Sequence, residues 1–137
     1  MFSNPAVTVH GLDDARAALR PGLPVVLLSG EGAALYAGSA WWTALIAAAR
    51  AEFPATMAAD LLDCADAPGR AMEALRLGQR GLILDPRVAS FRAVSEAAAA
   101  RSAIVLPHRP ASLDLTDHGA HRRLLAWLER DINQALH

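Results

Sequence analysis

The sequence contains no lysine, and this absence excludes several mechanisms. All 13 basic residues are arginine. Schiff-base aldolases and pyridoxal-phosphate enzymes need a lysine amine, and the Walker-type phosphate loop and the phospho-receiver site each use a lysine of their own. The chain therefore belongs to none of these classes in its intact form.

Cysteine and charge are also scarce. Cys64 is the single cysteine, so no disulfide forms within the chain, which suits a reducing compartment. Charged residues make up 20% of the sequence and the formal net charge is −1, which supplies no basic field for a phosphate backbone or an anionic lipid surface. We expect neither nucleic acid nor a membrane as a partner.

Two segments bear on localisation. The N-terminal residues MFSNPAVTVHG lack the basic stretch followed by an apolar stretch that marks a signal peptide. Residues 32–49 carry no charge and approach the length of a membrane span, but they consist mostly of small residues, which favours a buried helix. We expect a cytoplasmic protein.

Hydrophobic residues dominate what is present. They make up 53% of the 137 residues, a content and length typical of one domain with one filled core. No repeat or linker divides the chain, so a single α/β domain is predicted over residues 1–137.

Five short apolar runs alternate with helix-like segments. Continuous apolar strands separated by helices are typical of a parallel sheet covered on both faces. We therefore predict a three-layer α/β sandwich with a mostly parallel five-stranded sheet, similar to flavodoxin-like and receiver-like domains or to half of a (β/α)8 barrel. The predicted strands are Ala6 to Val9, Pro24 to Ser29, Thr56 to Asp63, Gly81 to Leu84 and Ala103 to Leu106.

Two helices suggest an interface. The helix near Trp41-Ala51 has an uncharged second side, Thr43, Ala44, Ala47 and Ala48, which indicates that something covers it. In the last helix an apolar stripe includes Leu124, Leu125 and Leu128, with Trp127 outside it among polar residues. A homodimer through either helix is the resulting expectation.

A binding site is expected where the parallel strands end, because loops and helix N-termini converge at that edge. Carboxylates, imidazoles and a glycine-rich turn follow the predicted strands there. The ligand-binding candidates are Ser29, Gly30, Glu31, Gly32, Asp63, Asp66, Asp85 and His108.

The segment CADAPGR places Arg70 six positions after Cys64, between a strand and a helix. This spacing resembles the Cys-x5-Arg loop of cysteine-dependent phosphatases. Rhodanese-like sulfurtransferases have a similar loop. The resemblance covers about seven residues and implies Cys64 as nucleophile and Arg70 as anion clamp. It departs from the family pattern at Ala71, where phosphatases carry a hydroxyl residue. The alternative is a small buried cysteine at the end of a strand.

The other candidate motifs also have two interpretations. Residues 29–32 form either an anion-binding nest or a simple turn before a helix. Asp63, Asp66 and Asp85 resemble an acidic magnesium pocket, but Asp66-Ala67-Pro68 and Asp85-Pro86 also read as helix starts. A third group could either bind zinc or serve in helix capping and core packing, and we assign no metal to it. Its members are His108, His118, His121, Asp114 and Asp117.

Three functions remain open at the level of sequence. The first is a module that binds a small polar ligand at the strand ends, and Glu31 favours a cation or a hydroxylated ligand there. The second is a thiol enzyme acting through Cys64 and Arg70. The third is a structural homodimeric partner protein. The cofactor is unknown, and whether the chain is an enzyme is left open.

Overall fold

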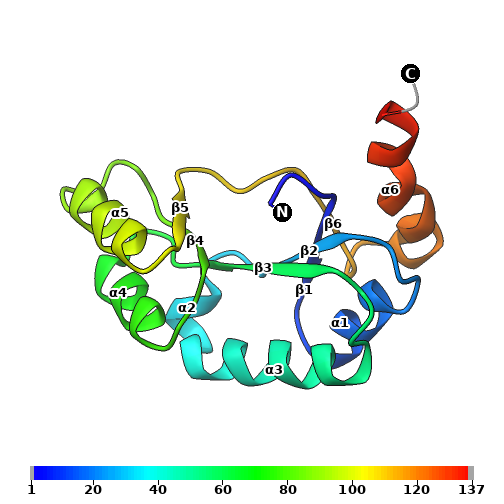
Figure 1. Cartoon of the computed structure of the whole chain (residues 1–137), viewed down its shortest axis with the longest axis horizontal. Helices are drawn as coiled ribbons and strands as arrows, with labels where there is room; N and C mark the ends of the chain where they lie inside the picture. The colour runs from blue at the N-terminus through cyan, green and yellow to red at the C-terminus, as the bar shows by residue number, and fades with distance from the viewer. Residues whose placement is uncertain (1, 136–137) are drawn as a thin grey trace. The chain divides into compact units, whose positions relative to one another are not determined.

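A computed structural model describes the backbone of residues 2–135 and the side chains of residues 2–130. Strands and helices alternate along most of the chain (Figure 1). The elements are β1 Ala6–Val9, α1 Leu12–Leu19, β2 Val25–Ser29, α2 Ala33–Tyr36, α3 Ser39–Glu52, β3 Ala58–Asp63, α4 Pro68–Arg76, β4 Gly81–Ile83, α5 Phe91–Ala100, β5 Ile104–Leu106, β6 Ser112–Asp114 and α6 Ala120–Ala135.

The α/β class and the parallel sheet are confirmed. The sheet has six strands rather than five, in the order β5-β4-β3-β2-β1-β6. From β1 to β5 each strand lies beside its predecessor in sequence, as in the half-barrel alternative. In a flavodoxin-like sheet the strand order reverses once, so that one pair of successive strands is not adjacent. The sixth strand escaped prediction because Ser112–Asp114 is only three residues long and Leu113 is its one buried side chain.

The chain divides into two compact units. Unit 1 comprises residues 1–28, 45–59 and 110–137, and unit 2 comprises residues 29–44 and 60–109. Each unit is built from segments that are distant in sequence. The single domain expected over residues 1–137 stays a prediction.

Unit 1 contains a parallel pair at one edge of the sheet. β1 pairs with β6 in the register Ala6↔Ser112 to Thr8↔Asp114. All four residues of β1 are buried, as its continuous apolar sequence predicts, and α1 and α6 contact these two strands. The buried side of α6 differs from the predicted apolar stripe. Leu128 is buried as predicted, whereas Leu125 is 53% exposed.

Unit 2 contains the pairs that position the candidate site. β4 pairs in parallel with β3 and with β5, through Asp63↔Ile83 and Ile83↔Leu106 among others. Helices α4 and α5 lie against each other, and α5 also contacts β5 (Figure 1). The carboxyl ends of three parallel strands therefore meet at one edge within this unit.

One predicted helix start and two predicted helix caps differ from the structure. α5 begins at Phe91 and not at Pro86, because the Asp85 carboxylate accepts a hydrogen bond from the backbone N–H of Arg87 and holds a turn instead of capping a helix. α4 does begin at Pro68, but its N-cap is Ala67 and no side chain caps it. Asp85 and Asp66 are thus not committed to helix capping.

Candidate functional site

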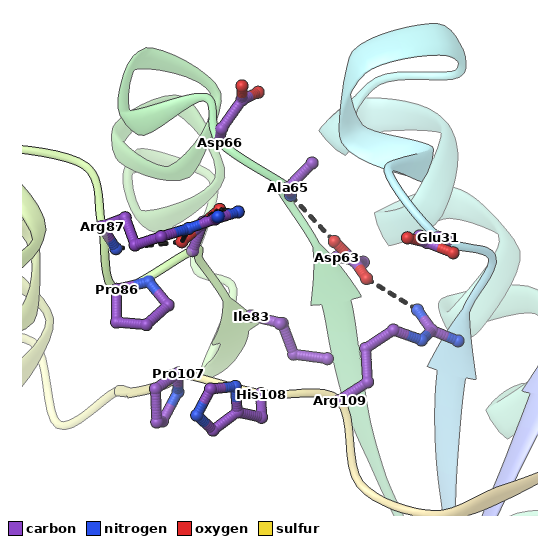
Figure 2. A pocket seen from close by; sticks show the side chains of 11 residues that line it. Glu31, Asp63, Ala65, Asp66, Ile83, Pro86, Arg87, Pro107, His108 and Arg109 are labelled. Atoms are coloured by element: carbon purple, nitrogen blue, oxygen red, sulfur yellow. Dashed lines mark hydrogen bonds and ion pairs between the residues drawn. The ribbon is translucent and has the colours of Figure 1, made fainter.

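An open pocket of about 680 Å³ lies in unit 2 at the carboxyl ends of β3 and β4. The segments that follow β2 and β5 complete its walls. It is lined by Glu31, Asp63, Ala65, Asp66, Ile83, Asp85, Pro86, Arg87, Pro107, His108 and Arg109. Figure 2 shows acidic, basic and apolar side chains arranged around the same hollow.

Asp63 and Arg109 form a buried ion pair on one side of the pocket. Arg109 Nη1 lies 2.7 Å from Asp63 Oδ2, with the Asp63 side chain 4% exposed and that of Arg109 26% exposed. The same nitrogen donates to the Ser29 carbonyl oxygen at 3.0 Å. Because Arg109 follows β5 while Asp63 ends β3, the pair ties the segment after β5 to the middle of unit 2.

Ala65 turns the chain after β3. Its φ is 48°, in the left-handed region that residues other than glycine rarely adopt. Two hydrogen bonds hold it, one from its own N–H to Asp63 Oδ1 at 2.8 Å and one from the N–H of Asp85 to its carbonyl oxygen at 2.8 Å. The turn places Asp66 at the pocket wall (Figure 2).

Asp85 and Arg87 form a second ion pair, which is exposed. Arg87 Nη2 donates to Asp85 Oδ2 at 2.7 Å, and Arg87 Nε and the backbone N–H of Arg87 both donate to Oδ1. These bonds lower the pKa of the Asp85 carboxyl to about 2, through the Arg87 side chain first and its backbone N–H second. Asp85 is therefore an anion at any physiological pH.

Three polar side chains of the pocket make no hydrogen bond or ion pair with another described residue. They are Glu31, Asp66 and His108, and all three are exposed. Asp66 interacts with Arg87, and His108 with Asp85, only through longer-range charge. These groups are the ones available to a ligand.

Five of the predicted site residues are brought together in this pocket: Glu31, Asp63, Asp66, Asp85 and His108. Ser29, Gly30 and Gly32 do not line it. Ser29 supports it from below, because its hydroxyl accepts from the N–H of Asp63 at 2.9 Å and donates to the Gly30 carbonyl oxygen at 3.0 Å. Gly32 is the N-cap of α2 with φ 68°.

The sequence-based candidate set omitted Arg87 and Arg109. Arg87 was detectable, because an aspartate two residues before an arginine across a proline forms a local pair. Arg109 follows a predicted strand and so stands at the correct edge, but its partner lies 46 residues away. Only the tertiary structure shows that pairing.

Cys64 does not have the properties of a nucleophile. Its side chain is buried at 0% exposure, and burial, with a smaller contribution from the charge of Asp63, raises its pKa to about 12. Arg70 lies on the exposed surface of α4, where it pairs with Glu73 at 3.2 Å. The structure matches the alternative interpretation of a small buried residue after a strand.

The other histidines of the described part of the chain lie away from the pocket lining. His118 and His121 are both exposed. Asp114 pairs with His10, whose Nε2 lies 2.9 Å from its Oδ1, and also accepts from the Thr116 hydroxyl. Among the described residues, no group of three or more His, Cys, Asp or Glu side chains has an arrangement that holds a metal ion.

The predicted interfaces receive mixed evidence. The uncharged side of α3 is exposed within the chain, so it is accessible to a partner. It consists of Thr43, Ala44, Ala47 and Ala48. Trp127 is half-buried within unit 1, where Nε1 donates to the Ala6 carbonyl oxygen at 2.8 Å and the Arg130 guanidinium lies 4.2 Å from its ring centre. The indole therefore already has partners in its own chain, and the homodimer stays a prediction.

The chemistry open to the pocket is limited. Among the described residues that line it, none carries a hydroxyl, thiol or amine, so the nucleophilic side chains there are limited to carboxylates and one imidazole. Carboxylates and an imidazole remain for hydrogen bonding and proton transfer. No helix of the described chain is both long and apolar enough to cross a membrane.

Comparison with known proteins adds no family. No protein-family model matches the sequence, and no curated protein matches it significantly. The case for function therefore depends on the pocket.

Proposed function

We propose that this protein is a small-molecule-binding module whose ligand occupies the pocket of unit 2. The carrying observation is a hollow of about 680 Å³ at the carboxyl ends of parallel strands, with Glu31, Asp66 and His108 unpaired on its walls. That volume lies within the range of roughly 300–1,000 Å³ typical of small-molecule sites. Carboxyl ends of parallel strands are also where α/β proteins bind their ligands.

The pocket contains both paired and unpaired polar side chains, and this combination supports ligand binding. Asp63 with Arg109, and Asp85 with Arg87, neutralise each other and fix the positions of the pocket walls. Because such paired groups hold their geometry before a ligand arrives, little further ordering is needed on binding. The unpaired side chains are left to recognise the ligand.

Binding is favoured over thiol catalysis for a physical reason. A thiol with a pKa of about 12 supplies almost no thiolate at neutral pH, and the thiolate is the form that attacks. The buried Cys64 therefore fits a structural role beneath the pocket better than a catalytic one.

The direct test is a metabolite screen monitored by two-dimensional amide NMR. A panel of small cationic, neutral and anionic metabolites is titrated into the 137-residue chain. We expect at least one compound to shift the resonances of Ala65, Asp66 and His108 in a saturable way, while resonances of unit 1 stay in place. No saturable shift at the pocket with any compound would refute the proposal.

A pocket-filling variant checks that the shifts report this site. Pro86 is exposed and lines the pocket, so Pro86→Trp places a large side chain in the hollow. We expect the variant to lose binding and to keep the wild-type unfolding midpoint. The matched control is Pro54→Trp, at an exposed turn of unit 1, which should bind as the wild type does.

A further inference from the structure

The charges that line the pocket do not cancel. The four carboxylates are Glu31, Asp63, Asp66 and Asp85, and the two guanidinium groups are Arg87 and Arg109. Two aspartates are paired with the two arginines at 2.7 Å each. Four negative charges less two positive ones leave −2 with His108 neutral, and this excess belongs to the unpaired Glu31 and Asp66.

Figure 2 shows how this excess is placed. Glu31 comes from the turn before α2, and Asp66 comes from the turn that follows Ala65 at the end of β3. Their two turns are in contact, because a Cβ built on Gly32 would lie 3.8 Å from the Cβ of Ala65. The two turns are therefore neighbours, but in Figure 2 the Asp66 side chain points away from Glu31, so the two carboxylates form separate sites of negative charge.

Apolar side chains also line the pocket, beside Arg87 and His108 (Figure 2). Ile83, Pro86 and Pro107 line it, and Ile83 is 4% exposed. Among the described residues, no group of three or more His, Cys, Asp or Glu side chains is arranged to hold a metal ion. A hollow of about 680 Å³ with an apolar wall fits a ligand that has a carbon skeleton.

We infer that the ligand of this pocket is a small organic cation, with ammonium groups bound by Glu31 and by Asp66 and its carbon skeleton against Ile83, Pro86 and Pro107. This inference rests on the proposed function, because it concerns the same site. A carboxylate accepts from an ammonium group through charge-assisted hydrogen bonds, which are about twice as strong as neutral ones. An anionic ligand would instead meet the uncompensated negative charge.

The test uses three compounds with the same four-carbon skeleton and different charge. Putrescine is a dication, 1,4-butanediol is neutral and succinate is a dianion at pH 7.5. Each is titrated into the intact chain at low salt, and binding is measured from amide shifts of Ala65 and Asp66. We expect putrescine to bind at least tenfold more tightly than 1,4-butanediol and succinate to show no saturable shift.

Charge-removing variants locate the ammonium. Glu31→Gln and Asp66→Asn keep the shape of each side chain, and each should weaken putrescine binding about tenfold, since a hydrogen bond to a charged group contributes about 1.4 kcal/mol or more. Both residues are exposed, so we expect both variants to fold. The matched control is Glu96→Gln on α5, an exposed acid that pairs with Arg92 and does not line the pocket.

The outcomes separate the two proposals. Tighter binding of succinate or 1,4-butanediol than of putrescine overturns the inference and leaves the proposed function standing. Putrescine binding that is unchanged in both Glu31→Gln and Asp66→Asn, or that Mg²⁺ at equal concentration abolishes by taking the same site, also overturns it. A pocket that responds to no compound of the wider metabolite panel refutes the proposed function together with the inference.

Discussion

Two aspartate–arginine pairs face the same pocket with the same separation, and they differ in almost everything else. The nitrogen and oxygen atoms lie 2.7 Å apart in both Asp63–Arg109 and Asp85–Arg87. In the first pair the side chains are 26% exposed for arginine and 4% for aspartate, whereas in the second they are 89% and 22% exposed. The first joins residues 46 positions apart and the second residues two positions apart.

The difference teaches that distance alone does not measure what an ion pair contributes. Solvent screens the exposed pair, and its two partners are neighbours even in the unfolded chain. In the other pair Asp63 has lost its water, so removing Arg109 leaves the aspartate charge uncompensated in the interior. Arg109 should therefore matter to the stability of unit 2, and Arg87 to the local electrostatics of the rim.

The largest expected effect concerns the thiol that lies next to the buried pair. With its pKa raised from 9.0 to about 12, native Cys64 should hold about a thousandfold less thiolate than a free cysteine at pH 7.5. Iodoacetamide should modify it only after unfolding in guanidinium chloride, as mass spectrometry would record. Rapid modification of the native chain would show that water reaches this side of Asp63 and would break the comparison.

The next effect is on stability. Arg109→Ala should lower the free energy of unfolding by about 3 kcal/mol, the lower end for a broken buried pair because Arg109 is partly exposed. Urea denaturation measures it. Arg87→Ala is the matched control, and we expect it to lower the free energy of unfolding much less, because solvent screens the exposed pair.

A double variant tests the reason for that loss. Asp63→Asn removes the charge but keeps Oδ1 as an acceptor for the Ala65 N–H. Combined with Arg109→Ala, it should recover part of the lost stability, because no unpaired charge remains buried. If the double variant were less stable than Arg109→Ala alone, the loss would come from the missing arginine contacts and not from the charge left behind.

A smaller effect is expected for the exposed pair, in its titration. Asp85 should titrate near pH 2 in a carboxyl ¹³C NMR experiment, and Arg87→Gln should raise the midpoint toward the ordinary 3.8. Since the folded pKa is the lower one, the pair's contribution to stability is complete above about pH 4 and is lost as pH falls toward 2. His108→Ala should raise the Asp85 midpoint only slightly, because His108 acts through charge at a distance.

The sequence predicted the strands better than the helix starts. Apolar runs marked β1 with its exact bounds and the other four early strands within two residues, because a buried parallel strand must be apolar throughout. The Asp85-Pro86 signal failed as a helix start, because the carboxylate bonds Arg87 instead. A capping pattern shows that a side chain could accept a hydrogen bond at a helix start. Other donors nearby, here those of Arg87, determine which hydrogen bond it accepts.

For the site, the places where the predicted strands end were enough to gather four acids and one imidazole into one candidate set. Parallel strands exit at a common edge, so Glu31, Asp63, Asp66, Asp85 and His108 had to approach it. Burial was not readable in the same way. Cys64 and Asp63 are adjacent at a strand end. Only the packing around them shows that the Cys64 thiol is enclosed while the Asp63 carboxylate pairs with Arg109.

The sequence by itself determined the α/β class, the parallel sheet and the edge where a pocket could form, because these follow from local hydrophobic patterns and from the common direction of parallel strands. Only the tertiary structure decided which charges at that edge are paired. Ion pairing depends on a few ångströms between residues such as Asp63 and Arg109, whose separation in sequence carries no information about their separation in space. That pairing leaves Glu31, Asp66 and His108 as the polar side chains of the pocket without a hydrogen bond or ion pair to another described residue.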